Sequence, residues 1–130
     1  MNKALVMASL SACALNAAAA ETPLHLRDGY ARAAGLAPAE LSVAAGEALF
    51  RRGGDGERQC VSCHTEDPRR KGKTRAGKLI APLAPSANAA RFTDAAKAEK
   101  WFARNCADVL GRACSAREKA NLIAWLMTIN

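Results

Sequence analysis

Two cysteines and a histidine stand close together in the segment Cys60-Val61-Ser62-Cys63-His64. Two thiols at this spacing match the two vinyl groups on one edge of a haem, and the imidazole that follows at once can reach the haem iron. The segment therefore predicts one covalently attached haem c, with thioether bonds to Cys60 and Cys63 and with His64 as the proximal iron ligand.

The same cysteines permit two other kinds of site. A structural zinc ion could use Cys60, Cys63, Cys106 and Cys114, but such sites usually hold two close pairs, and the second pair is too widely spaced in this sequence. A thioredoxin-like Cys-x-x-Cys motif belongs at the start of a helix in a βαβ pattern, which this sequence lacks. Both are weaker interpretations than haem attachment.

The sequence offers no obvious sixth ligand to the iron. Electron-transfer cytochromes usually supply a methionine sulfur, yet no methionine occurs from 65 to 114. Met127 fits a gap-filling core residue of the last helix, and His25, ahead of the haem-binding part, fits a surface histidine. By elimination, the sixth position is open or holds a weak ligand, such as an amide oxygen, a lysine amine or water, which a small molecule can displace.

A haem would also help to fill the core. The chain has 130 residues, of which 50% are hydrophobic, but many of these are alanine, and the aromatic residues are only three Phe, two Trp and one Tyr.

The formal net charge is +7, and much of it lies in a basic segment made of Arg69, Arg70, Lys71, Lys73, Arg75 and Lys78. This segment could attract an acidic redox partner or a small anion, or could simply be solvated. Nucleic acid binding is not expected, because few aromatic residues are present to stack bases.

The N-terminus has the features of a secretion signal. Lys3 provides a positive charge, residues 4–15 are apolar, and Ala18-Ala19-Ala20 forms a small-residue cleavage site before Glu21. We therefore expect a signal peptide over residues 1–20 and export to the periplasm.

The exported part, residues 21–130, has a length that suits one domain. A competing interpretation is a lipoprotein signal ending at Cys13. No other segment is apolar over a length that could span a membrane.

Once Cys13 and the two haem-motif cysteines are set aside, Cys106 and Cys114 remain as a pair, and export permits them to form a disulfide.

The pattern of the exported part predicts an all-α protein. Four helices are expected beside the haem motif: 24–34, 38–52 beginning at Pro38, 93–105 capped by Thr93, and a last helix whose capping box is Ser115 and Glu118. Gly53 ends the second helix and opens a connector over 53–58. Three prolines and scattered glycines predict a long, wrapped loop over 66–86, and no strand shows convincing alternation.

Several stretches after the haem motif closely resemble the sphaeroides haem protein family of class I monohaem cytochromes c with an asparagine axial ligand. The stretches are 73–87, 91–94, 99–101, 104–106, 111–114 and 118–120. The resemblance implies the class I cytochrome c fold, with helices packed around one haem. It also implies that Asn105 binds ferric iron and detaches on reduction, and that Cys106 is bridged to Cys114.

The resemblance carries a functional expectation as well. A ferrous iron freed from its amide ligand would bind a diatomic gas (O2, NO or CO), and electrons would come from a dihaem cytochrome c and a membrane cytochrome b. An amide oxygen is a hard ligand that suits ferric better than ferrous iron. Asn88 is the alternative amide. A plain electron-transfer cytochrome c and a small-molecule reductase at the open haem site are the rival functions, although no acid or base is visibly placed for turnover.

The aromatic residues fit packing around the haem better than electron conduction. This applies to Trp101, Phe102 and Trp125, whose spacing is helical. In class I cytochromes a glycine and an aromatic residue of the first helix meet an aromatic residue of the last helix, and Gly46, Phe50 and Trp125 match that arrangement.

Overall fold

A computed structural model describes residues 20–53 and 58–130. The predicted signal peptide apart from Ala20, the lipidation candidate Cys13 and residues 54–57 of the predicted connector lie outside these residues. Within them, no helix combines the length and apolar character needed to cross a membrane.

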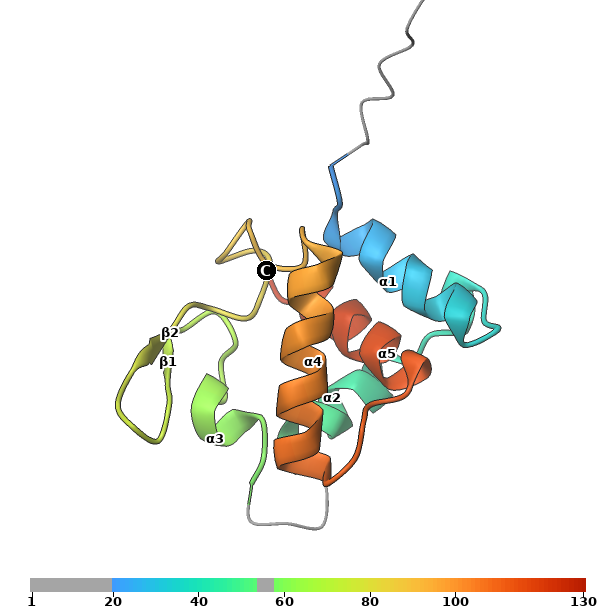
Figure 1. Cartoon of the computed structure of the whole chain (residues 1–130). Helices are drawn as coiled ribbons and strands as arrows, with labels where there is room; N and C mark the ends of the chain where they lie inside the picture. The colour runs from blue at the N-terminus through green and yellow to red at the C-terminus, as the bar shows by residue number, and fades with distance from the viewer. Residues whose placement is uncertain (1–19, 54–57) are drawn as a thin grey trace, which may run out of the picture.

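Helices dominate the described chain, which confirms the all-α prediction. They are α1 (Pro23–Ala33), a 3-10 turn (Pro38–Glu40), α2 (Val43–Arg52), α3 (Val61–His64), α4 (Ala95–Leu110) and α5 (Ala116–Met127). The two short strands β1 (Gly72–Lys73) and β2 (Leu79–Ile80) pair in an antiparallel hairpin. Figure 1 shows α4 running across the middle of the molecule, with α3 and the hairpin on one side and α1 and α5 on the other.

Helices α2 and α5 cross at Gly46. A Cβ atom at this position would clash with the backbone carbonyl of Asn121, so only glycine lets the two helices approach this closely. One turn further along, the rings of Phe50 and Trp125 lie 4.9 Å apart between centroids. The predicted arrangement is therefore confirmed for Phe50, which contacts Trp125, while Gly46 lies against Asn121 of the same last helix. The Asn121 side chain also accepts a hydrogen bond of 2.9 Å from the backbone N–H of Ser42, at the start of α2.

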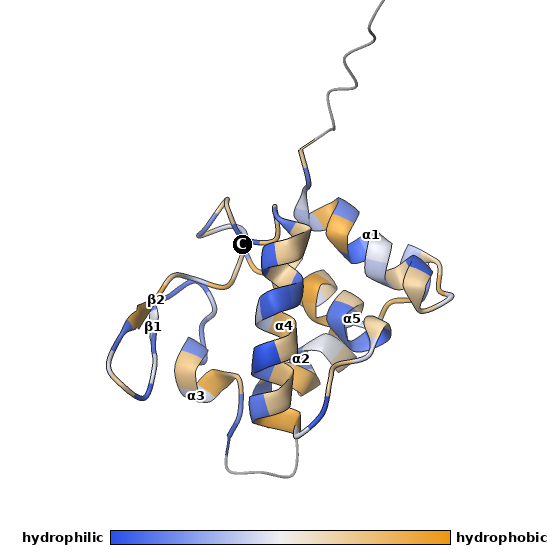
Figure 2. Ribbon diagram, viewed as in Figure 1, coloured by the Kyte–Doolittle hydropathy of each residue, from blue (hydrophilic) through white to orange (hydrophobic). Residues whose placement is uncertain are grey.

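The core lies between α5 and the helices on either side of it. Phe50, Ile123 and Leu126 are its largest fully buried side chains. On the other side of α5, Tyr30 of α1 meets Phe102 of α4 edge to face, with centroids 5.8 Å apart. Along α4, Figure 2 shows both hydrophilic and hydrophobic residues, as in a helix with one polar and one apolar face.

Three predicted helix boundaries are wrong, and capping explains all three. The expected helix 38–52 is interrupted, because the Ser42 side chain accepts the Ala45 N–H and α2 begins only at Val43. The expected helix 93–105 is capped by Asp94 instead of Thr93, and it continues to Leu110, where Gly111 ends it with a φ of 67°.

The other expected helices are confirmed. The first lies at Pro23–Ala33, within one residue of its predicted bounds. The last begins with the predicted capping box, in which Ser115 accepts the Glu118 N–H and the Glu118 side chain accepts the Ser115 N–H. Helix α2 ends at Arg52 with Gly53 as its C-cap, as expected.

The predicted loop 66–86 contains the β1–β2 hairpin, which the sequence analysis did not anticipate. The strands are too short to show the alternation by which a strand is recognised in sequence. A Cβ atom at Gly72 would clash with the Cys63 carbonyl, so the hairpin packs tightly on the haem motif. The hairpin is thus one support of α3.

Candidate haem site

The haem motif forms part of the wall of a cavity of about 1440 Å³. This volume exceeds the roughly 300–1000 Å³ of ordinary small-molecule pockets. The cavity therefore has room for a large planar cofactor such as a haem. Cys60, Cys63 and His64 all line the cavity, together with Phe50 of α2 and the cavity-facing side of α4. The residues present therefore fit a haem attached at one wall.

A single helical turn positions the three residues of the motif. The His64 N–H donates a hydrogen bond of 2.9 Å to the Cys60 carbonyl, and the ring of Phe50 lies 6.5 Å from the imidazole between centroids. Burial, with the positive charge of Arg91 as a second cause, lowers the pKa of His64 to about 4. The imidazole is therefore neutral at physiological pH, which is the form that binds a metal.

The Cys60 thiol lacks the character of a redox-active thiol. Burial raises the pKa of the Cys60 thiol to about 11, with the neighbouring Cys63 as a smaller cause that also raises it. Reactive and catalytic cysteines have a lowered pKa instead. This environment argues against the thioredoxin-like interpretation and leaves two thiols that are not engaged in a disulfide.

One side of α4 forms the opposite part of the cavity lining. Its cavity residues include Ala98, Trp101, Phe102, Asn105, Cys106 and Val109, which recur at helical spacing, with Lys97, Arg104, Asp108 and Leu110 beside them. Asn105 thus lies on the wall of the same cavity as His64. Phe102 and Trp125 are buried in the core, as predicted, and Trp101, which is 42% exposed, lies on the wall of the haem cavity. Trp101 borders the cavity, with the Arg104 guanidinium 5.7 Å from its ring centroid.

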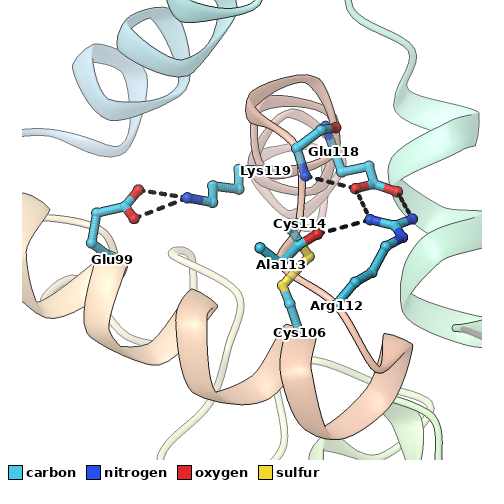
Figure 3. The surroundings of a disulfide bond; sticks show 8 residues. Glu99, Cys106, Arg112, Ala113, Cys114, Glu118 and Lys119 are labelled. Atoms are coloured by element: carbon cyan, nitrogen blue, oxygen red, sulfur yellow. Dashed lines mark hydrogen bonds and ion pairs between the residues drawn. A yellow bond between two sulfur atoms is a disulfide. The ribbon is translucent and has the colours of Figure 1, made fainter.

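A disulfide joins Cys106 to Cys114, which confirms the predicted pair (Figure 3). It ties α4, one residue after Asn105, to the segment that leads into α5. Beside it, Arg112 pairs with Glu118, and this ion pair is the largest cause that lowers the pKa of Glu118 to about 2. The zinc alternative fails, because the disulfide removes two of its four sulfur ligands.

The other candidate ligands are placed differently from Asn105. Met127 is half-buried against the core and His25 is exposed on α1, and neither lines the cavity. Their predicted roles as core residue and surface histidine are confirmed. Asn88 does line the cavity, but its side-chain N–H donates a hydrogen bond of 3.1 Å to the Pro82 carbonyl. This bond holds the Asn88 amide against its own loop.

One charged residue of the cavity was missed by the sequence analysis. Arg91 is half-buried and lines the cavity. No local pattern marks an arginine whose partners are backbone carbonyls, so no sequence signal singled it out. Of the predicted basic segment, Lys73, Arg75 and Lys78 line the cavity as well, whereas Arg69 pairs with Asp67 at 2.9 Å.

Residues 36–126 match the protein family described as a domain of unknown function, DUF1924. The chain is 51% identical over 109 residues to the cytochrome c-type protein SHP of Cereibacter sphaeroides, covering 81% of this chain and 82% of that protein. The structure of oxidised SHP, described as an oxygen-binding cytochrome c, superposes with a TM-score of 0.75 and 46% identity. That alignment covers 85% of this chain and 99% of SHP.

A second relative is cytochrome c'' of Methylophilus methylotrophus. Its oxidised crystal structure superposes with a TM-score of 0.71 at 38% identity, covering 83% of this chain and 94% of cytochrome c''. Its solution structure, described with insights into haem-ligand detachment, superposes with a TM-score of 0.65 at 39% identity. It covers 82% of this chain and 92% of the other.

Proposed function

Because this chain belongs to the DUF1924 family and to the c-type cytochromes related to SHP, and so carries one covalently attached haem c, we propose that it is a periplasmic haem protein with a labile sixth ligand. Cys60 and Cys63 form the thioether bonds, and His64 is the proximal ligand. Asn105 is the labile ligand on the distal side.

One observation carries the proposal. Asn105 and His64 line the same cavity, whereas Met127 and His25, within the described residues, lie outside its lining. When bound, the haem supplies an iron that accepts electrons and, once reduced, takes up a diatomic gas. The side-chain oxygen of Asn105 is a hard donor, so it favours ferric over ferrous iron and is held less firmly after reduction.

The properties named for the relatives agree with this role. SHP is described as an oxygen-binding cytochrome c, and the solution structure of cytochrome c'' addresses haem-ligand detachment. For this chain we infer a gas ligand such as O2, NO or CO. A dihaem cytochrome c and a membrane cytochrome b would be the electron donors, reached after export by the signal peptide over residues 1–20.

The disulfide next to Asn105 supports the same assignment. Cys106 is buried and bonded to Cys114, so the backbone directly after Asn105 is fixed on the cavity side of α4. With the backbone fixed, only the Asn105 side chain has to move for its amide to detach from the iron and bind again.

Optical spectra of the oxidised, reduced and CO-treated reduced protein test the labile ligand. We expect the oxidised protein to be six-coordinate, and the reduced protein to be five-coordinate, high-spin and reactive toward CO. Asn105→Ala should open the ferric form to added anions such as azide. The matched control is Asn88→Ala, which removes the other amide of the cavity and should leave all three spectra unchanged.

The rival functions predict different spectra. A reduced protein that stays low-spin and does not react with CO would mean a plain electron-transfer cytochrome, and the proposal would be wrong. Continuous consumption of O2 or NO, at a rate set by the supply of electrons, would instead indicate a reductase. If Asn88→Ala had the effect expected of Asn105→Ala, the ligand assignment would move to Asn88.

A further inference from the structure

Arg91 is a half-buried cation on the wall of the haem cavity, and no carboxylate of the described residues pairs with it. Burial lowers the pKa of its guanidinium. Among the described residues, no carboxylate oxygen lies within 4.0 Å of its nitrogen atoms. A charge withdrawn from water is costly unless an opposite charge accompanies it. Among the described residues, Arg91 therefore presents a partly desolvated positive charge with which an anion bound in the cavity can pair.

Two carbonyl groups of the loop accept hydrogen bonds from Nε and Nη2 of the guanidinium, and Nη1 has no such partner among the described residues. Nε donates to the Pro82 carbonyl at 3.2 Å, and Nη2 donates to the carbonyls of Ala81 at 2.9 Å and Pro82 at 3.0 Å. Nη1 donates to no residue of the described chain in this arrangement, so two of the five N–H donors remain available. A carboxylate oxygen is a strong acceptor for either of these charged N–H donors.

The backbone next to Arg91 is held in an uncommon conformation. Phe92 has a φ of 61°, and Thr65, directly after His64, has a φ of 64°. Side-chain-bearing residues seldom adopt positive φ, and the surrounding structure must enforce it. Here Phe92 is buried, and its ring stacks on Phe102 at 6.4 Å between centroids. The two positions thus fix the backbone beside the haem-motif histidine and beside Arg91.

We propose that Arg91 binds a carboxylate of the haem, one of its two propionates, and keeps it ionised inside the cavity. This inference rests on the proposed function, since it needs the haem in this cavity. The other basic side chains of the wall are Arg58, Lys73, Arg75, Lys78, Lys97 and Arg104, and the acidic ones are Asp94 and Asp108. Of all these, Arg91 alone is half-buried and the others are exposed to solvent, which screens their charges.

The midpoint potential of the haem-loaded protein tests the proposal. An ionised propionate without its cation favours ferric iron, so Arg91→Gln should lower the potential and make it depend on pH, because the propionate now gains a proton on reduction. The slope approaches about 59 mV for each tenfold change in proton concentration where that proton is taken up. Arg91→Lys keeps the charge and should restore most of the potential. Arg104→Gln is the matched control and should give a small shift that is independent of pH.

The outcomes separate this inference from the proposed function. If Arg91→Gln and Arg104→Gln give the same potential and the same pH dependence, Arg91 does not bind a propionate. That result would not contradict the proposed haem attachment or the proposed iron ligands. If Arg91→Gln yields no haem-loaded protein, carbon-13 NMR of labelled propionates in the unmodified protein decides. A pKa of one propionate well below that of the other supports the proposal, and two equal pKa values overturn it.

Discussion

At the scale of single residues, Cys60 and Cys63 are expected to hold the haem by bonds that survive denaturation. Thioethers resist acidified acetone, whereas coordination to His64 does not, so haem should remain with the unmodified protein after extraction. The double variant Cys60→Ala with Cys63→Ala should lose all its haem in the same treatment. Absorbance of the protein pellet measures it.

The second cysteine pair provides the control for that experiment. Cys106→Ser with Cys114→Ser removes the same number of sulfur atoms but leaves the haem motif intact, so haem should stay with the protein. Extraction of haem from the unmodified protein would contradict covalent attachment. Retention of haem by the variant that lacks Cys60 and Cys63 would contradict the assignment to these two thiols.

The role of a residue could be predicted from the sequence where its partners are near in sequence. The haem motif is a local pattern and was recognised directly. Asn105 required the family resemblance, because an asparagine in a helix has no spacing that marks it as a ligand. Arg91 could not be found, since its partners are carbonyl groups of Ala81 and Pro82. Helical spacing placed Trp101 and Phe102 on one face of a helix, but it could not show which of them is buried and which borders the cavity.

At the scale of elements, the crossing of α2 and α5 depends on the absence of a side chain at Gly46. Gly46→Ala should destabilise the haem-loaded protein by about 1–3 kcal/mol, since the added Cβ meets the Asn121 carbonyl and the helices must separate. Denaturant unfolding measures the change. The separation would also displace Phe50, which lines the haem cavity, so a shift of the haem absorbance should accompany it.

Gly29 provides the matched control, because it lies within helix α1 and has space around it. The nearest heavy atom to a Cβ at Gly29 is an Arg32 nitrogen at 3.9 Å, an ordinary contact. Gly29→Ala should therefore stabilise the protein by about 0.5–1 kcal/mol through the helix preference of alanine. Equal effects of the two substitutions would mean that α2 and α5 do not meet at Gly46.

The helices themselves could be predicted, whereas three of their ends could not. Ser42 is an acceptable N-cap for α2, and Thr93 and Asp94 are both acceptable for α4. In each helix the N-cap is the residue whose side chain accepts the N–H three residues further along, which is Ser42 in α2 and Asp94 in α4. The extension of α4 past Asn105 follows from Gly111, the first residue free to take a positive φ. Local preference alone did not rank these signals.

At the scale of the whole molecule, the haem cavity opens among positive charges. The described residues that line it include seven basic side chains but only two acidic ones, Asp94 and Asp108. Asp108 is already engaged, since it lies 3.9 Å from Arg58. The sequence predicted a basic segment, but the chain had to fold before Lys97 and Arg104 of α4 joined Lys73 and Lys78 around the same cavity.

This arrangement predicts how charged reagents exchange electrons with the protein. Oxidation of the reduced protein by anionic hexacyanoferrate should slow as salt is added, and oxidation by a cationic cobalt complex should accelerate, because salt screens attraction and repulsion alike. Lys78→Glu, at the cavity, should slow the anionic reaction severalfold in stopped-flow measurements at low salt. Lys100→Glu changes the net charge equally at an exposed site outside the cavity lining and should have a much smaller effect. Equal effects of the two variants would show that the total charge of the molecule, and not its arrangement around the haem, attracts the reagent.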